Sequence, residues 1–81
     1  MSSFYVSLSS IDEVKRFVDA ATRCACEIDV LSGRYVINAK SIMGLFSLDL
    51  SQPVQVEVQG TDEQRESFRR DVAPFEVQPK E

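Results

Sequence analysis

The residue with the clearest chemical potential is Ser41, which directly precedes the apolar run IMGLF at residues 42–46. A serine before a short apolar helix is an N-cap, because its hydroxyl accepts a hydrogen bond from a free backbone N–H at the helix start. The same free amides and the helix dipole also accommodate a phosphate dianion. Ser41 is therefore a candidate phosphorylation site as well as a cap; the residue pattern alone favours capping, and the two roles are compatible.

The segment after Ser41 carries more large apolar side chains than one face of a two-turn helix can bury. We expect Leu45, Phe46 and Leu48 to belong to the core. Ile42 and Met43, at the start of the helix, are then exposed, and methionine suits an adaptable docking surface. The pattern predicts a protein-binding patch at Ile42 and Met43.

No other group of residues indicates an independent enzyme, because the chain contains no histidine, no reactive triad and no phosphate-cradling glycine loop. Cys24 and Cys26 are separated by one residue, which is too tight for an easy disulfide, and they lack the further Cys or His of a zinc site. We expect two reduced thiols that act as small apolar side chains on one face of a strand, with a redox pair as the alternative. We expect no metal ion and no cofactor.

Length and composition predict one small soluble domain over residues 1–81, with 43% hydrophobic and 27% charged residues. A formal net charge of -4, without a Lys/Arg cluster longer than a pair, argues against direct binding of nucleic acid. No apolar run approaches the roughly 20 residues of a membrane span, and residues 1–10 do not resemble a signal peptide. These features predict a cytoplasmic protein with no membrane association.

Hydrophobic periodicity predicts both strands and helices along the chain. Alternation of apolar and polar residues predicts strands at residues 4–8, 24–30, 34–39 and 54–59. Helical spacing predicts amphipathic helices from residue 11 and after Thr61, and a short helix follows Ser41. Residues 75–77 add a short extended tail after Pro74, which limits the last helix.

Two capping boxes fix the starts of the long helices. In the first, the Ser10 hydroxyl is expected to accept the Glu13 backbone N–H while the Glu13 carboxylate reaches back to Ser10. Thr61 and Gln64 form the second box. The resulting order of elements is β-α-β-β-α-β-α.

The segment NAKSIMGLFSL at residues 38–48 resembles the regulatory-serine segment of HPr, the phosphocarrier of bacterial sugar phosphotransfer, and the similarity runs from about Phe4 to Val72. The resemblance implies an α+β fold, the HPr-like open-faced β-sandwich. In this fold helices cover one face of a four-stranded antiparallel sheet.

The resemblance also implies that histidine phosphotransfer is lost. In HPr the segment before the first helix reads His-Ala-Arg-Pro, with the His as phosphoacceptor and the Arg steadying its phosphate. Here Ser10 stands at the histidine position, Asp12 at the arginine position and Glu13 at the proline position. Two carboxylates there would repel a phosphate, so the chain resembles an HPr homologue without a catalytic residue.

Ser41 falls on the serine that a dedicated kinase/phosphorylase modifies in Gram-positive HPr and in the histidine-lacking catabolite-repression HPr-like protein, which is a co-repressor. Ile42 and Met43 match the docking residues of that family. Asp12 replaces a basic residue that helps to read the phosphoserine, and Asp49 replaces a glycine after the short helix. The partners that the resemblance implies are a kinase/phosphorylase or a transcriptional regulator.

Three functions remain open from the sequence. The first is a regulatory or adaptor module that is switched at Ser41. The second is a constitutive protein-interaction domain, in which Asp12, Glu13 and Asp19 supply an acidic surface. The third is a phosphocarrier that uses Ser10, which is disfavoured because a serine phosphoester lacks the transfer potential of a phosphoimidazole.

Overall fold

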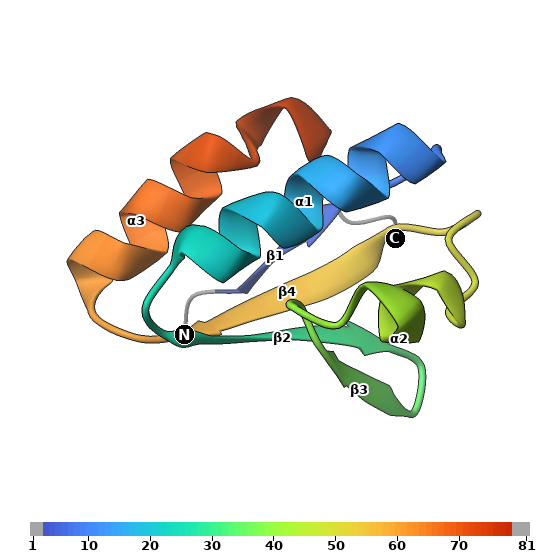
Figure 1. Ribbon diagram of the computed structural model, residues 1–81, viewed down its shortest axis with the longest axis horizontal. Coiled ribbons are helices and arrows are strands. Elements are labelled where there is room, and N and C mark those ends of the chain that lie inside the picture. The colour runs from blue at the N-terminus through green and yellow to red at the C-terminus, as the bar shows by residue number, and fades with distance from the viewer. Residues whose placement is uncertain (1–2, 79–81) are drawn as a thin grey trace.

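The computed structural model describes residues 3–78, which form two layers. Figure 1 shows α1 and α3 side by side over one face of a sheet, with α2 next to β3. The elements are β1 (Ser3–Val6), α1 (Ile11–Arg23), β2 (Glu27–Ser32), β3 (Tyr35–Asn38), α2 (Ile42–Phe46), β4 (Val54–Gln59), α3 (Asp62–Asp71), the 3-10 helix η1 (Ala73–Phe75) and β5 (Glu76–Val77).

The sheet is antiparallel, and its strands lie in the order β3-β2-β4-β1-β5. Its α+β class and its single helical layer agree with the expectation from the sequence. The expected number of four strands is too small, because β5 pairs with β1 and places Val77 opposite Tyr5. This fifth strand is the short extended tail predicted at residues 75–77, and pairing on the free edge of β1 makes it part of the sheet.

The core lies between the sheet and the helices, and no polar or charged residue of 3–78 is buried there. Alternate residues of each central strand point into it, as the period of two requires. Phe17 of α1 packs against Phe68 of α3 with an edge-to-face geometry and 5.6 Å between ring centroids. This contact holds α1 and α3 together over the sheet. In this position the first residues of α1 lie near the end of α2.

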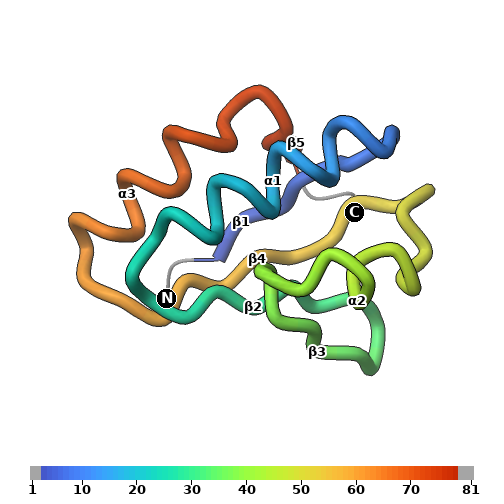
Figure 2. Tube along the Cα trace, in the orientation of Figure 1, coloured from blue at the N-terminus to red at the C-terminus, as the bar shows by residue number. Residues whose placement is uncertain are grey.

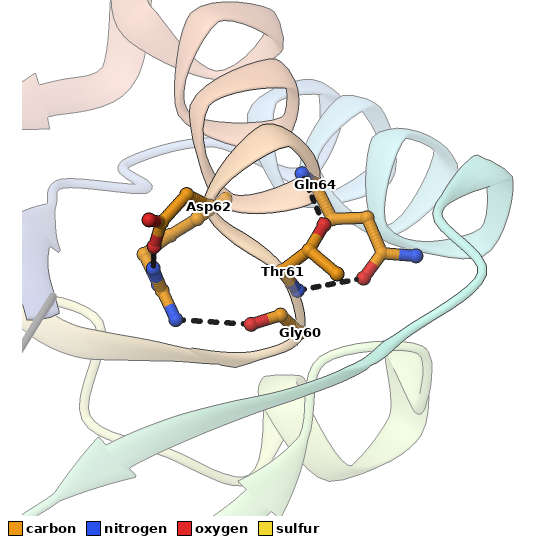
Figure 3. A network of polar contacts seen from close by, with 5 residues as sticks. Gly60, Thr61, Asp62 and Gln64 are labelled. Atoms are coloured by element: carbon orange, nitrogen blue, oxygen red, sulfur yellow. Dashed lines mark hydrogen bonds and ion pairs between the residues drawn. The ribbon is translucent and has the colours of Figure 1, made fainter.

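The capping box of α3 forms as predicted, and Figure 3 shows its two reciprocal hydrogen bonds. The Gln64 backbone N–H donates to Thr61 Oγ1 over 3.1 Å, and the Thr61 backbone N–H donates to Gln64 Oε1 over 2.9 Å. Arg65 donates to the Gly60 carbonyl at 3.0 Å and pairs with Asp62. Hydrogen bonds and an ion pair therefore fix the residues at the start of α3.

The capping box of α1 forms only in part. The Glu13 backbone N–H donates to Ser10 Oγ over 3.1 Å, as expected. The Glu13 carboxylate, however, accepts from the backbone N–H and the hydroxyl of Ser9, at 2.7 and 3.0 Å, rather than from Ser10. Ser9 offers two donors to one oxygen where Ser10 offers only its backbone N–H, so the longer reach satisfies more groups.

The cysteines lie before β2 rather than on it, so the prediction of a strand beginning at residue 24 was wrong. The Cys24 backbone N–H donates to the Ala21 carbonyl and closes α1, and the chain needs residues 24–26 to turn back toward the sheet. Cys26 is buried, Cys24 is half-buried, and both are free, with 3.0 Å between their sulfur atoms. Burial raises the pKa of the Cys26 thiol to about 11, which favours the inert protonated form.

Candidate functional site

Ser41 is the N-cap of α2 and lies on the surface. Its backbone is extended, and its Oγ accepts a hydrogen bond of 3.3 Å from the Gly44 backbone N–H. The turn before it is held by the Lys40 backbone N–H, which donates to Asn38 Oδ1 over 2.8 Å. The cap predicted from the sequence is therefore present, and the side chain that carries the hydroxyl is exposed.

Gly44 sets the way in which α2 lies on the sheet. A Cβ at this position would come within 2.7 Å of Ile37 Cγ2 and 3.0 Å of Ser41 Oγ, so only a glycine allows this approach. Leu45 follows and is fully buried. The helix is consequently fixed with one side against β3 and the opposite side in solvent.

The exposure of the other α2 side chains follows from this orientation. At about 100° per residue, Met43 lies about 160° away from Leu45, whereas Ile42 lies only about 60° away. Met43 is accordingly 78% exposed, as predicted, whereas Ile42 is half-buried against the core. The expectation that Ile42 is exposed and that Phe46 is a core residue was wrong, because Phe46 is 41% exposed.

The start of α1 and the loop after α2 come together in an open groove of about 400 Å³. Figure 2 shows these two segments at the same end of the molecule. The groove is lined by Leu8, Ser9, Ser10, Ile11, Val14, Phe46, Leu50 and Ser51. It contains no basic lining residue, so nothing in it resembles the arginine that steadies a phosphate in HPr.

Sequence reasoning missed two residues of this groove, Ile11 and Leu50. Ile11 is 64% exposed at the first position of α1, outside the buried stripe of that helix. Its place at the helix start, off the buried stripe, was the signal that the sequence offered. A single exposed apolar residue is common, however, and indicates an interaction surface only where other apolar residues adjoin it. The tertiary structure supplies those neighbours, Phe46 and Leu50, from a distant part of the chain.

The three residues assigned to the phosphate position are occupied in other ways. Ser10 caps α1. Asp12 forms an exposed ion pair of 2.9 Å with Arg16 one turn along the helix. Hydrogen bonds from the Ser9 backbone and side chain lower the pKa of Glu13, which keeps it ionised and bound to the loop.

The structure brings Ser10 next to α2, but it does not bring Ser10 and Ser41 together. Ser10 lies in the groove beside Phe46, at the C-terminal end of α2. Ser41 caps the opposite end, and five helical residues span roughly 7.5 Å. In the described part of the chain no group of three or more His, Cys, Asp or Glu side chains is arranged for a metal ion, and no helix could span a membrane.

Comparison with known proteins matches this chain to one family. The family model for the PTS HPr component phosphorylation site matches residues 13–73. Comparison with curated protein sequences finds no match.

Solved structures with the same fold include three phosphocarrier proteins. The crystal structure of HPr-C-His from Thermoanaerobacter tengcongensis has a TM-score of 0.71 and 26% identity, and it covers 90% of this chain and 92% of that one. The phosphocarrier protein HPr from Bacillus anthracis str. Ames has a TM-score of 0.70 and 23% identity, with 91% and 95% covered. A mycoplasma histidine-containing phosphocarrier protein has a TM-score of 0.69 and 12% identity, with 90% and 93% covered.

Proposed function

Because the chain belongs to the HPr family of the phosphotransferase system, we propose that it is a regulatory or adaptor member of that family that binds a protein partner through α2 and does not carry phosphate on a histidine. In this proposal residues 1–81 act as one cytoplasmic HPr-like module without an enzymatic activity of its own. The partner is a kinase/phosphorylase, a transcriptional regulator, or both in turn.

The observation that carries the proposal is a contiguous apolar patch, the α2 patch, made of Ile11, Met43 and Phe46. Met43 and Phe46 are three residues apart on α2 and therefore lie side by side on its surface. Phe46 and Ile11 line the same groove. Single exposed apolar residues are common, but adjoining ones from two helices are typical of an interaction surface.

Three features support the absence of phosphocarrier chemistry. The chain has no histidine. The Ser10 hydroxyl at the equivalent position is used as a helix cap, and Asp12 stands where a cation would help a phosphate. A phosphoryl group on Ser10 would thus lie near carboxylates instead of a cation, which disfavours Ser10 as an alternative acceptor.

Ser41 is the proposed switch, because it adjoins the α2 patch and its side chain is exposed. A phosphoserine there keeps an acceptor oxygen for the Gly44 N–H and adds a dianion at the start of α2. That charge would lie two residues from Met43, so it would change the affinity of a partner that covers Met43. The constitutive alternative has less support, because Asp12 and Asp19 of its acidic surface are already paired with Arg16 and Arg23.

Phosphorylation is tested by incubating the chain with an HPr kinase/phosphorylase and ATP and measuring its intact mass. We expect the addition of one phosphate to the wild-type chain and to the control variant Ser10→Ala, and none to Ser41→Ala. An unmodified wild-type chain would remove the switch, although it would leave partner binding untested.

Partner binding is tested separately with the immobilised chain and purified candidate regulators. Met43→Ala truncates the most exposed member of the α2 patch, and we expect at least a tenfold loss of affinity if Met43 is an anchor of the interface. Tyr35→Ala is the matched control, because Tyr35 is similarly exposed but lies on β3. Equal losses in the two variants, or no loss in Met43→Ala, would reject the α2 patch as the binding surface.

A further inference from the structure

The sheet has a second face that no helix of residues 3–78 covers (Figure 1). Because side chains alternate along a strand, the residues opposite the buried ones point to this open face. The strand register places five of them directly opposite one another across all five strands. Four of the five are aliphatic or aromatic, and we call this set the apolar row: Val36, Leu31, Gln55, Tyr5 and Val77, in the order β3-β2-β4-β1-β5.

The neighbouring positions on the open face are polar, and three of the six are acidic. At two residues from the apolar row along each strand, the register places a second row, made of Asn38, Asp29, Glu57 and Ser3. Two residues beyond that row, Glu27 lies opposite Gln59. Three carboxylates, those of Glu27, Asp29 and Glu57, therefore gather beside the apolar row. At about 3.4 Å per residue, the second row lies about 7 Å from the apolar row.

These carboxylates have no cationic partner in the described part of the chain. The five strands contain no lysine or arginine, and the ion pairs of residues 3–78 lie within α1, within α3 and between α3 and β5. Glu27 accepts from Asn38 Nδ2 at 3.1 Å, and Asp29 accepts from Gln59 Nε2 at 3.4 Å. Neutral amides thus orient two of the three carboxylates, Glu27 and Asp29, and leave their charges uncompensated.

The apolar row is accessible from solvent. Val36 is 61% exposed on the edge strand, and Leu31 and Tyr5 are half-buried. Both of these half-buried side chains line a hollow of about 390 Å³, which extends to Pro53 in the loop before β4. A side chain from another molecule can therefore contact the row in a concave part of the surface.

We propose that the open face is a docking surface for a cationic segment of a partner protein, in which a Lys or Arg lies about 7 Å from an apolar side chain. The apolar side chain would contact Leu31 and Tyr5, and the cation would lie over Asp29 and Glu57. A second copy of this chain is a poor occupant, because it presents the same acidic residues and a net charge of -4. This surface is separate from the α2 patch, so it stands or falls independently of the function proposed above.

The test uses a synthetic peptide with the sequence Gly-Ser-Leu-Ser-Lys-Ser-Lys-Ser-Gly, in which leucine and lysine are two residues apart on one side of an extended chain. Binding is followed at low salt by amide chemical shifts of the 15N-labelled protein. We expect saturable shifts confined to β1, β2, β3 and β4. Peptides with Lys replaced by Glu, or with Leu replaced by Ser, should bind at least fivefold more weakly.

Two matched variants separate local recognition from general attraction. Glu57→Gln and Glu63→Gln each remove one negative charge, but Glu63 lies on α3 over the other face. Glu57→Gln should weaken the peptide about two- to fivefold, as expected for one partly exposed ion pair, whereas Glu63→Gln should leave affinity nearly unchanged. Val36→Ser, at a position that is already exposed, should weaken binding without unfolding the chain.

Several outcomes would overturn the proposal. Shifts centred on the helices, equal effects of Glu57→Gln and Glu63→Gln, or no saturable shift at millimolar peptide would each reject a cationic site on the open face. A dimer in sedimentation velocity that Val36→Ser dissociates would instead identify a second copy as the occupant.

Discussion

Replacement of Ser41 separates its role as a helix cap from its role as a site of negative charge. The structure assigns one hydrogen bond to its side chain, the 3.3 Å bond from the Gly44 N–H, in an exposed position. Ser41→Ala removes this acceptor. Ser41→Asp keeps an acceptor oxygen and adds a charge, which imitates part of a phosphoserine.

The expected magnitudes follow from the geometry. Loss of an N-cap costs about 0.5–2 kcal/mol, and the length and exposure of this bond place Ser41→Ala near the lower end, at about 0.5–1 kcal/mol. At roughly 4–8 °C per kcal/mol for a chain of this size, the melting temperature should fall by about 2–8 °C. For Ser41→Asp the cap is retained and the dipole adds at most about 0.3–1 kcal/mol, so the melting temperature should stay at the wild-type value or rise by up to about 8 °C. Ser41→Gly should lose only a few tenths of a kcal/mol, because glycine is tolerated at this position.

Thermal and urea unfolding of the four proteins at neutral pH and low salt provide the assay. The expected order of stability places Asp and Ser highest, Gly next and Ala lowest. Repulsion by Asp12 is a small correction at most, because that carboxylate is paired with Arg16. If Ser41→Asp proves more than about 1 kcal/mol less stable than Ser41→Ala, the start of α2 does not tolerate an anion, and both the dipole argument and the phosphorylation switch are refuted.

Three further predictions concern other parts of the molecule. Gly44→Ala should lower stability by about 1–2 kcal/mol, because an overpacking cost of about 1–3 kcal/mol exceeds the helical gain of up to about 1 kcal/mol. The loss should shrink in the Ile37→Ala background, which removes the nearer contact and leaves the one with Ser41 Oγ. An equal loss in both backgrounds in a double-mutant cycle would contradict the contact with Ile37. Hydrogen bonds from Arg69 lower the pKa of Glu76, so the stabilisation that they give is present at neutral pH and is lost as the pH falls below about 4.5. The free energy of unfolding in urea should therefore drop less between pH 7 and pH 3 for Glu76→Gln than for the wild type. An identical drop in the two proteins would exclude this linkage. Cys26 should react with iodoacetamide at pH 7.5 far more slowly than a free cysteine, because burial raises the pKa of its thiol to about 11. Peptide mass mapping measures the extent of alkylation. Rapid alkylation of Cys26 in the folded protein would disprove its burial.

Most of the fold could be predicted from the sequence, because its elements follow local rules. The period of two in VQVEVQ predicts β4, and the actual strand has the same bounds, Val54–Gln59. The caps Ser10, Ser41 and Thr61 lie directly before the three α-helices, since a short polar side chain satisfies a free N–H wherever the following residues are helical. Errors at the strand ends arose where long-range pairing decided the outcome, as when β5 joined the edge of β1.

The candidate site could be predicted only in part. Its serine and Met43 were readable from the segment at residues 38–48, but the exposure of Phe46 was not. Phe46 is apolar, and local sequence cannot tell which side of a five-residue helix faces the core. The contact of Gly44 with Ile37 decides that orientation, and these two residues are on different elements.

The sequence by itself determined the order of the elements, the capping of the helices and the absence of a histidine, since each is a property of the chain or of residues within one turn. Only the tertiary structure decided which apolar side chains became surfaces. Ile11 joined Phe46 in one groove, and Leu31 joined Tyr5 on the open face, because packing and strand register bring together residues that are far apart along the chain. Side-chain burial depends on what covers a residue, and the covering element is set by the whole fold.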